Sequence, residues 1–366
     1  MRAIHPKRVI VAMSGGVDSA VAAGLLRDRG YDVVGVTMRM YAPTRPAAAR
    51  SCCGAEDFDD ARRSAAILGV PHYVVDFEAA FRRNVVDRFS GDYLAGRTPN
   101  PCVSCNNDVK LGTLRRYAER LGAGYVATGH YARLEHRDDG ARLARAADAA
   151  KDQSYALAGL TQAQLASLLL PLGDLTKPEV RRLAADYGLP VHEKPDSQDV
   201  CFVEGGDYRA LVAAAGRERR GTVVTTTGDV VGAHAGVSGF TVGQRRGLPA
   251  THFDDGPRYV TAIDAASATI VVGRARELYS AGLVAGEVNL IRPERFGAEP
   301  LRVFAMTRYR APLAAAAATI DGDTLRLAFE RPERAVAPGQ LVALYDDAGG
   351  VLGSGTISEA VPQGTP

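Results

Sequence analysis

The sequence has no stretch approaching the roughly 20 consecutive apolar residues that cross a bilayer, which excludes an ordinary membrane-spanning protein. Its first residues, MRAIHPKRVIVAM, lack the apolar core and small-residue cleavage site of a signal peptide. With 46% hydrophobic and 23% charged residues, the composition also excludes a disordered or fibrous chain. Without a membrane span or a signal peptide, a cytoplasmic protein is the expectation. Because 366 residues are too many for one ordinary domain, we also expect two or three domains.

Neither sign of charge predominates, since 44 basic and 42 acidic residues leave a net charge of +2. A nucleic-acid partner would therefore have to bind a local patch. Lysine is scarce: there are 39 arginines and five lysines, four of which fall between positions 110 and 194. Lysine offers a compact ammonium where arginine offers a planar fork, so the cluster either marks positions that need that geometry or arises by chance.

Cysteine is also scarce, and five is an odd number, which argues against a disulfide framework and favours reactive or metal-binding thiols. We assign no role to the adjacent Cys52 and Cys53, because buried unreactive cysteine is common. Cys102 and Cys105 lie in TPNPCVSCN, and Cys201 lies in PDSQDVCF; both stretches are predicted to be polar, exposed loops.

The C-x-x-C spacing of Cys102 and Cys105 is half of a zinc site, but no second C-x-x-C is present. An iron–sulfur cluster held by these two residues and Cys201 stays open, although we favour metal-free sulfur chemistry. Cys105 is predicted to precede a helix, whose N-terminal N–H groups would lower the pKa of its thiol.

Apolar runs alternate with helical patterns through the first half of the chain, as in the predicted strand 8–13 and the predicted helix 17–30. This alternation predicts an α/β fold with a parallel sheet, helices on both faces and ligands at the carboxyl ends of the strands. After about residue 205, short β-branched runs separated by glycine predict small antiparallel sheets or a barrel. We expect a catalytic domain over 1–204, a small, mostly β central domain over 205–278 and a C-terminal β-barrel over 279–358.

The hexapeptide SGGVDS at 14–19 follows a predicted strand and opens a predicted helix. Its glycines let the backbone approach an anion, and its hydroxyls and the helix N-terminal N–H groups suit phosphate oxygens. It is neither a Walker A motif nor a G-x-G-x-x-G fingerprint. An ordinary capped glycine turn is the alternative. The full motif resembles that of the PP-loop ATP pyrophosphatases, which cleave ATP between the α- and β-phosphates and adenylate an oxygen of their substrate.

The chain resembles the tRNA-specific 2-thiouridylases (the MnmA family) nearly from end to end. The motifs that carry the resemblance follow SGGVDS in the family's order: TPNPCVSCNNDVKL, ATGHYAR, KDQSYAL, KPDSQDVCF, GFTVGQRRGL, TRYRAP and PGQLVALYD. The resemblance implies that ATP adenylates the C2 carbonyl oxygen of the wobble uridine of certain tRNAs and pyrophosphate leaves. A cysteine persulfide then supplies sulfur, AMP departs and 2-thiouridine remains. It also implies Mg²⁺ with the ATP, and a cysteine desulfurase or sulfur relay protein as sulfur donor.

The resemblance further implies the residues of the site. The residues that would bind ATP are Ala12, Met13, Ser14, Gly15, Gly16, Val17, Asp18, Ser19, Met38 and Gly129. The catalytic residues would be the nucleophile Cys105 and the persulfide carrier Cys201. The residues that would contact RNA are Asn100, Pro101, Cys102, His130, Lys151, Asp152, Gln153, Arg308, Tyr309 and Gln340.

One position departs from the family pattern: some relatives have an aspartate where this chain has Cys102. A thiol cannot take the role of that carboxylate directly. The role is therefore dispensable, or a thiolate fills it, or Cys102 belongs to a metal or redox site.

The thiol chemistry is consistent with two cysteines. A persulfide is a strong sulfur nucleophile, and a second thiol can attack its inner sulfur to form a disulfide and release hydrosulfide. Two rival functions remain. A PP-loop ligase that amidates a small carboxylate would need an ammonia source, and no glutaminase motif is recognisable. A non-catalytic RNA-binding protein would not need the intact SGGVDS or the cysteine motifs.

Overall fold

The computed structural model describes residues 5–41, 54–195, 200–203, 207–216, 218–248 and 256–364. Cys52 and Cys53, to which the sequence assigned no role, lie outside the described residues. The chain divides into two compact units: the first comprises 1–86, 102–207 and 349–351, and the second 87–101, 208–348 and 352–366. Within the described ranges, no helix is both long and apolar enough to cross a membrane.

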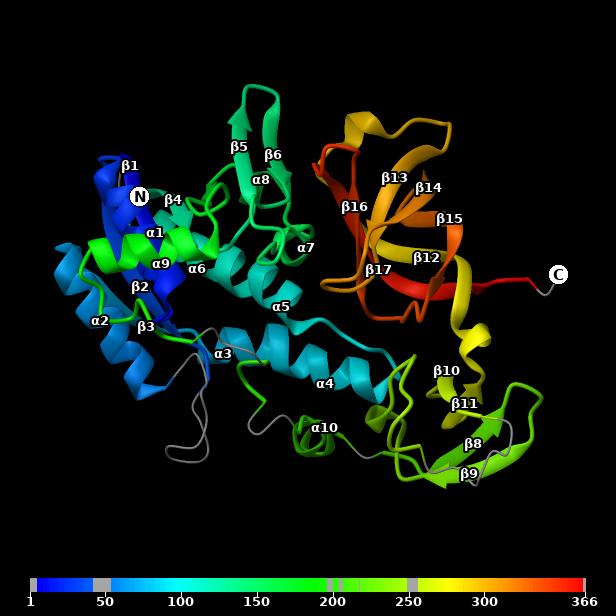
Figure 1. Ribbon diagram of the computed structural model, residues 1–366. Coiled ribbons are helices and arrows are strands. Elements are labelled where there is room, and N and C mark those ends of the chain that lie inside the picture. The colour runs from blue at the N-terminus through cyan, green and yellow to red at the C-terminus, as the bar shows by residue number, and fades with distance from the viewer. Residues whose placement is uncertain are drawn as a thin grey trace. The chain divides into compact units, whose positions relative to one another are not determined.

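The first unit is built on a five-stranded sheet in which all strands run parallel, in the order β3-β2-β1-β4-β7 (Figure 1). In the central strand β1, Val9, Ile10 and Val11 are all fully buried, because the sheet is covered on both faces. This confirms the predicted parallel sheet. The strands are β1 (His5–Ala12), β2 (Asp32–Arg39), β3 (His72–Asp76), β4 (Ala123–Ala127) and β7 (Leu168–Leu169).

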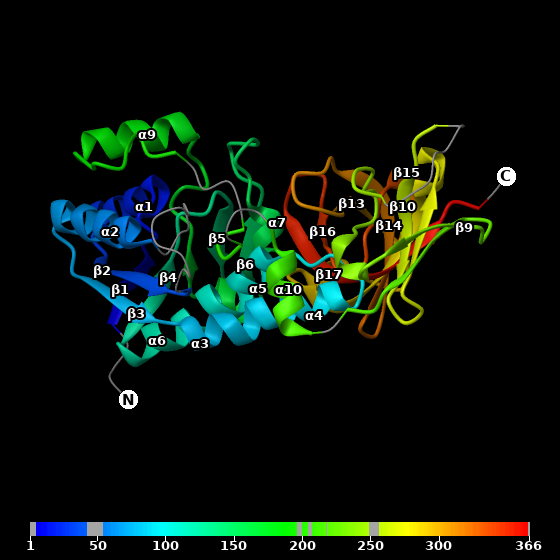
Figure 2. The same cartoon turned by 90° about the horizontal axis from the view of Figure 1, so that it is seen from below.

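Helices cover both faces of this sheet, as predicted. Figure 2 shows α1, α2 and α9 on one side of strands β1–β3, and α3 and α6 on the other. On the first side, Val9 and Val11 share one apolar core with Val21 of α1 and Val180 of α9. The helices are α1 (Val17–Asp28), α2 (Ala55–Leu68), α3 (Glu78–Phe81), the π-helix η1 (Arg82–Val86), α6 (Leu114–Arg120) and α9 (Lys177–Asp186). The unit also contains the hairpin β5 (Arg133–Arg137)–β6 (Gly140–Ala144) and the short helices α7 (Ser154–Leu157) and α8 (Gln162–Leu165).

The strand order places a switch point between β1 and β4. From β1 the chain proceeds to β2 and β3 on one side, and then continues with β4 and β7 on the other. In open parallel sheets, the crevice at such a reversal, beyond the carboxyl ends of the strands, is where ligands bind. Residues 13–19 follow β1 and residues 128–130 follow β4, so both segments lie at this position.

The stretch that carries Cys102 and Cys105 is helical, so its prediction as a loop is wrong. The chain forms α5 (Pro101–Ser104), the π-helix η2 (Cys105–Thr113) and then α6 without interruption. Proline suits the first position of a helix, where its missing N–H is not needed, and Pro101 opens this one. Cys105 therefore lies beyond the first turn of a helix that has already begun, and does not precede a helix as the sequence predicted.

The second unit contains a four-stranded sheet and a closed six-stranded barrel. The sheet has the order β10-β11-β8-β9, and its pair β11–β8 is parallel while the other pairs are antiparallel. Its strands are β8 (Gly221–Thr225), β9 (Val230–His234), β10 (Tyr259–Asp264) and β11 (Thr269–Gly273). The fold is therefore α/β, with a parallel-sheet N-terminal domain followed by a small β domain and a β-barrel.

The barrel has the order β12-β15-β14-β13-β16-β17. Small side chains fill part of its interior: in β14, Ala316 and Ala318 are buried beside Leu325 and Leu327. The barrel strands are β12 (Tyr279–Leu290), β13 (Leu301–Met306), β14 (Ala314–Asp321), β15 (Thr324–Arg334), β16 (Leu341–Tyr345) and β17 (Val351–Pro362). The helices of this unit are α4 (Asp87–Leu94), α10 (Arg209–Ala215) and the 3₁₀ turns η4 (Val237–Gly239), η5 (Ala275–Leu278) and η6 (Pro293–Arg295).

Candidate active site

The loop after β1 is hydrogen-bonded to the first turn of α1, the helix that follows it. Ser14 N–H donates to Ser19 Oγ at 3.1 Å, and Ser19 Oγ donates to the Gly16 carbonyl at 3.0 Å. Gly15 has a φ of +76°, and a Cβ at this position would lie 2.2 Å from the Asp57 carbonyl oxygen of α2. Only glycine fits there. Ser14 is exposed, so its hydroxyl is accessible to a ligand.

Helix α1 begins at this loop with an N-cap glycine, Gly16, whose position has no side-chain cap hydrogen bond. The first-turn N–H groups of α1 are consequently not capped by a side chain at that position. Aligned peptide dipoles add a partial positive charge at the same end of the helix. A helix N-terminus of this kind can bind an anion such as phosphate.

The segment after β4 packs directly against the loop. A Cβ added to Gly129 would lie 2.7 Å from Asp18 C and from Ser19 N, so no larger side chain fits. In the neighbouring strand, Val36 pairs with Ala12, and the buried Met38 lies two residues further on. The structure thus brings Gly129 into contact with the SGGVDS loop and places Met38 at the same edge of the sheet.

Asp18 is held by two residues that the sequence did not single out as site residues. Lys177 Nζ donates to Oδ1 and Oδ2 of Asp18 at 2.8 and 2.9 Å, and Tyr131 Oη donates to Oδ1 at 2.7 Å. The Lys177 side chain is 9% exposed and that of Asp18 is 32% exposed. A buried ammonium therefore lies beside the loop that would bind the phosphates.

Lys194 is the second lysine that contacts the loop, through the carbonyl of Gly15. The scarcity of lysine was a signal for both Lys177 and Lys194, and Lys194 also opens the motif KPDSQDVCF. No local motif connects either residue to SGGVDS, because they lie more than 150 positions further along the chain.

A buried polar chain orients the start of the loop. Thr37 Oγ1 donates to the Met13 carbonyl at 2.7 Å and lies 2.8 Å from His72 Nε2. Since the hydroxyl has one proton, and donates it to Met13, His72 Nε2 is the donor to Thr37. Burial, with a smaller contribution from Arg62, lowers the pKa of His72 and keeps the ring neutral.

We expect the free energy of unfolding to fall as the pH drops from about 7.5 to about 5.5. Burial lowers the pKa of His72, and burial with a contribution from Lys110 lowers that of His130 well below its usual value. Below the usual histidine pKa of about 6.5, the unfolded chain then binds more protons than the folded one. The stability from neutral rings is present above that pH and is lost as the pH falls through it.

The variant His72→Gln keeps a donor for Thr37 and does not titrate, so it should lose less stability over this range than the wild type. Urea unfolding at both pH values measures the difference. An equal loss in the two proteins would contradict the role assigned to His72.

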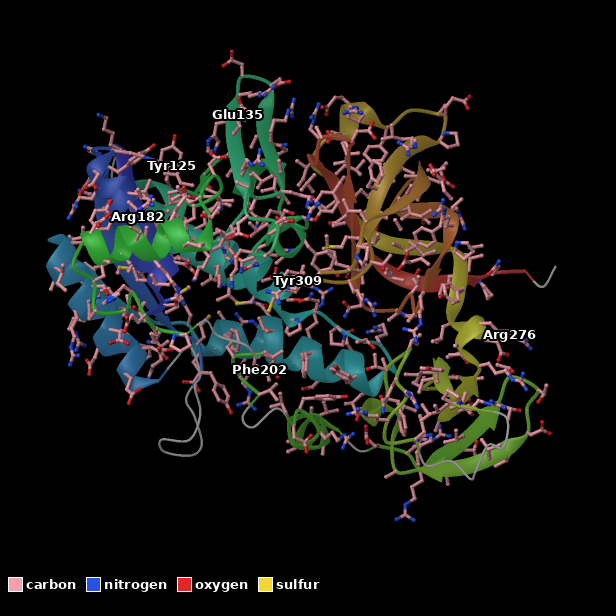
Figure 3. All side chains as sticks on the ribbon, viewed as in Figure 1. Tyr125, Glu135, Arg182, Phe202, Arg276 and Tyr309 are labelled. Atoms are coloured by element: carbon pink, nitrogen blue, oxygen red, sulfur yellow. The ribbon has the colours of Figure 1, made fainter. Side chains whose placement is uncertain are left out.

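The three described cysteines differ in exposure: Cys102 is exposed, Cys201 is half-buried and Cys105 is 7% exposed. Cys102 and Cys105 lie three positions apart on one helix, so they are neighbours on its surface. Phe202 packs edge-on against Phe81 of α3, with ring centroids 5.5 Å apart (Figure 3). Helix α3 also contacts η2, which begins at Cys105. One helix therefore contacts both cysteine-bearing segments.

The KDQ segment, residues 151–153, is connected through Tyr131 to Asp18 of the SGGVDS loop. Tyr131 N–H donates to Gln153 Oε1 at 3.0 Å, and Gln153 N–H donates to the Tyr131 carbonyl at 2.8 Å. The carboxylate of Asp152 accepts from Arg145 and from the N–H and Oγ of Ser154. The side chains of Asp152 and Gln153 thus have partners within the fold, and Lys151 beside them is half-buried.

The π-helix that begins at Cys105 is connected to α7, the helix after the KDQ segment. Asn106 Nδ2 donates to the Ala156 carbonyl at 3.0 Å, while Asn106 Oδ1 is buried without a partner. His130, at the end of β4, lies 2.7 Å from Thr128 Oγ1 through its Nδ1. Both the cysteine helix and His130 therefore belong to the first unit, together with the SGGVDS loop.

Five of the residues expected to contact RNA lie in the second unit: Asn100, Pro101, Arg308, Tyr309 and Gln340. Gln340 Nε2 donates to the Thr98 carbonyl at 2.8 Å, just before Asn100 and Pro101. Arg308 and Tyr309 are exposed after β13. Gln340 therefore holds the backbone of a neighbouring segment, whereas Arg308 and Tyr309 form an accessible surface.

Among the residues that the structure describes, no group of three or more His, Cys, Asp or Glu side chains is placed to hold a metal ion.

Three family models match successive parts of the chain. Residues 7–205 match a model described as a tRNA methyl transferase HUP domain. Residues 209–274 match a tRNA methyl transferase PRC-barrel domain, and residues 280–357 match an aminomethyltransferase beta-barrel domain.

Curated relatives match over almost the full length. The tRNA-specific 2-thiouridylase MnmA of Moorella thermoacetica is 46% identical over 363 residues, which cover 97% of this chain and 100% of the relative. The protein of the same name from Mycobacterium avium is 47% identical over 358 residues, which cover 96% and 99%. Among solved structures, an NMN synthetase from Francisella tularensis is 19% identical with a TM-score of 0.34 over 57% of this chain and 76% of that chain, a likeness too weak to bear on the fold.

Proposed function

The chain belongs to the family of tRNA-specific 2-thiouridylases, and from this premise we infer that it is itself a tRNA 2-thiouridylase, an ATP-dependent sulfurtransferase. The observation that carries this function is the SGGVDS loop at the switch point of the parallel sheet, in the same unit as Cys102, Cys105 and Cys201. A loop that binds phosphates and a set of thiols are the two parts that adenylation followed by sulfur transfer requires.

For ATP, we propose the residues Ala12–Ser19, Met38 and Gly129. Support comes from the hydrogen bonds between Ser14, Gly16 and Ser19, the N-terminus of α1, and the close approach of Gly129 to the loop. Mg²⁺ would accompany the phosphates as a hard cation. Asp18 suits a hydrated Mg²⁺, because it is the carboxylate of the loop itself and its side chain is 32% exposed. When bound, the metal would neutralise phosphate charge.

In the first step, O2 of the wobble uridine attacks the α-phosphorus of ATP, the bond to the β-phosphate breaks, and pyrophosphate leaves. The resulting O-adenylate makes the C2 oxygen a good leaving group. A wobble base has to leave the anticodon stack to reach the loop. The neutral His130 and the first turn of α5 are the proposed neighbours of that base.

In the second step, we propose that Cys201 carries a persulfide and that the Cys105 thiolate attacks its inner sulfur. A Cys105–Cys201 disulfide forms and hydrosulfide is released, which attacks C2 and expels AMP. The disulfide requires two electrons from a dithiol reductant before the next turnover. Its formation requires the two Cα atoms to come within about 4.4–6.8 Å.

For tRNA, we propose contacts by Asn100, Pro101, Cys102, His130, Lys151, Asp152, Gln153, Arg308, Tyr309 and Gln340. The exposed Arg308 and Tyr309 suit a phosphate and a base, respectively. Asp152, Gln153 and Gln340 already have partners within the fold, so we propose that they hold the backbone that the RNA contacts. We further propose a cysteine desulfurase or sulfur relay protein as sulfur donor, the cytoplasm as location, and domains over 1–204, 205–278 and 279–358.

The test is tRNA-dependent release of pyrophosphate. Incubation with ATP and bulk tRNA should release pyrophosphate and, with a persulfide donor, give 2-thiouridine detectable by nucleoside mass spectrometry. A methyl transferase, the activity named in two of the matched family models, would release no pyrophosphate and would need a methyl donor. An amidating ligase would respond to a small carboxylate, and a binding protein would release nothing. Pyrophosphate release without tRNA dependence would contradict the proposal.

A further inference from the structure

Lys194 has three acceptors around its ammonium. Nζ donates to the Gly15 carbonyl at 3.1 Å, to Asp57 Oδ1 at 2.6 Å and to Asp60 Oδ2 at 2.7 Å. An ammonium has three N–H donors, and here each has a partner. Although burial opposes the charged form, the hydrogen bonds that the ammonium donates to the two carboxylates raise the pKa of Lys194, so the ammonium stays charged.

The acceptor in the loop determines what this lysine does. In a trans peptide, the carbonyl and the following N–H point in opposite directions. A lysine that fixes the carbonyl of Gly15 therefore also fixes the direction of the N–H of Gly16. That N–H belongs to the turn that leads into α1, where phosphate oxygens need donors. If this peptide turned over, it would present a carbonyl oxygen to an anion.

Glycine is required at position 15 for its backbone conformation, but glycine also makes the peptide easy to turn. The fold therefore needs an external restraint on this peptide. Lys194 supplies it from a segment that is itself anchored, since Arg181 of α9 donates to the carbonyls of His192 and Lys194. Lys177, one turn before Arg181 on the same face of α9, binds Asp18 at the other end of the loop.

We propose that Lys194 is a positioning residue for nucleotide binding, which orients the Gly15–Gly16 peptide so that its N–H points to the phosphates of ATP. The proposal rests on the function proposed above, because it assumes that the loop binds ATP. It does not require Lys194 to touch the nucleotide. Asp57 and Asp60 hold the ammonium in place and share its charge.

The first experiment replaces Lys194 by methionine, which keeps the length of the side chain and removes its donors. The KM for ATP in tRNA-dependent pyrophosphate release should rise about tenfold, as expected for the loss of a hydrogen bond to a charged group, while kcat changes less than about twofold. Lys194→Arg keeps the charge but spreads its donors over a planar fork, so its KM for ATP should lie between those of the wild type and of Lys194→Met. The matched control is Lys7→Met, since Lys7 is exposed on β1, and it should leave KM unchanged.

The second experiment separates orientation from charge. Without Lys194, Asp57 and Asp60 would repel the nucleotide, and this alone would raise KM. In the triple variant Lys194→Met, Asp57→Asn, Asp60→Asn, that repulsion is absent, but the peptide is still not restrained. KM should stay raised; its return to the wild-type value would overturn the proposal, as would an unchanged KM in Lys194→Met.

Thermal unfolding checks that the variants fold, and Lys194→Gln replaces the methionine variant if that one does not. If wild-type protein releases no pyrophosphate, the proposed function fails, but the role of Lys194 is still tested by equilibrium dialysis of ATP. In that measurement, the Kd of Lys194→Met should be about tenfold higher than that of wild type and of Lys7→Met. Equal Kd values would overturn the proposal independently of the function.

Discussion

Replacing Cys105 or Cys201 by serine should abolish the formation of 2-thiouridine while leaving pyrophosphate release in place. Serine retains the shape of cysteine but cannot carry or attack a persulfide. Neither thiol takes part in the attack of O2 on the α-phosphorus, so ATP and tRNA should still bind. Nucleoside mass spectrometry and a pyrophosphate assay on the same samples separate the two steps.

Cys102→Ser is the matched control, because Cys102 is a neighbour of Cys105 on the same helix but is not assigned to either sulfur-transfer step. It should retain a measurable yield of 2-thiouridine. If it is as inactive as the other two variants, and the purified protein contains stoichiometric iron, the persulfide mechanism fails and a three-cysteine cluster takes its place. Iron content therefore has to be measured for all three variants together.

The described cysteines differ in their access to solvent. Cys105 is 7% exposed, whereas Cys102 is exposed. Cys105 opens the π-helix η2, and π-helical turns are frequent at functional sites. The exposed Cys102 should react first with an alkylating reagent in the absence of substrates.

The SGGVDS loop could be predicted because its sequence pattern is local. A strand, two glycines and a helix follow one another within 8–28, and these neighbours are enough to suggest phosphate binding. Gly129 meets the loop because β4 lies beside β1 in the sheet. The alternation of strands and helices predicts a parallel sheet, but it does not predict which strands are neighbours.

The residues that restrain the loop could not be predicted in the same way. Lys177 and Lys194 reach it through tertiary contacts, and a single sequence gives no pattern for such pairs. The composition gave only an indirect indication of these residues, because a chain that almost always uses arginine has lysine at these two positions. The helix at Pro101 was missed for the opposite reason: local turn residues suggested a loop, whereas proline is as suitable for a helix start.

Substitutions of Asp18 and Lys177 should differ in their effects on stability and have the same effect on activity. Asp18→Ala leaves the buried ammonium of Lys177 without its carboxylate and should cost about 2 kcal/mol of unfolding free energy. Lys177→Met removes that charge and keeps the volume, while Asp18 remains partly exposed and bonded to Tyr131, so stability should change little. Both variants should lose about a hundredfold in pyrophosphate release, because the loop loses its carboxylate or the ammonium beside it.

The double variant distinguishes this account from a general loss of folding. Once Asp18 is absent, removing Lys177 as well takes away the unpaired buried charge, so the double variant should be more stable than Asp18→Ala alone. Its activity should not recover, because neither charged group is restored. Urea unfolding and pyrophosphate release on the wild type, both single variants and the double variant complete the cycle. If the two stability losses simply add, Lys177 and Asp18 are not coupled in the fold, and the ammonium has no special connection to the loop.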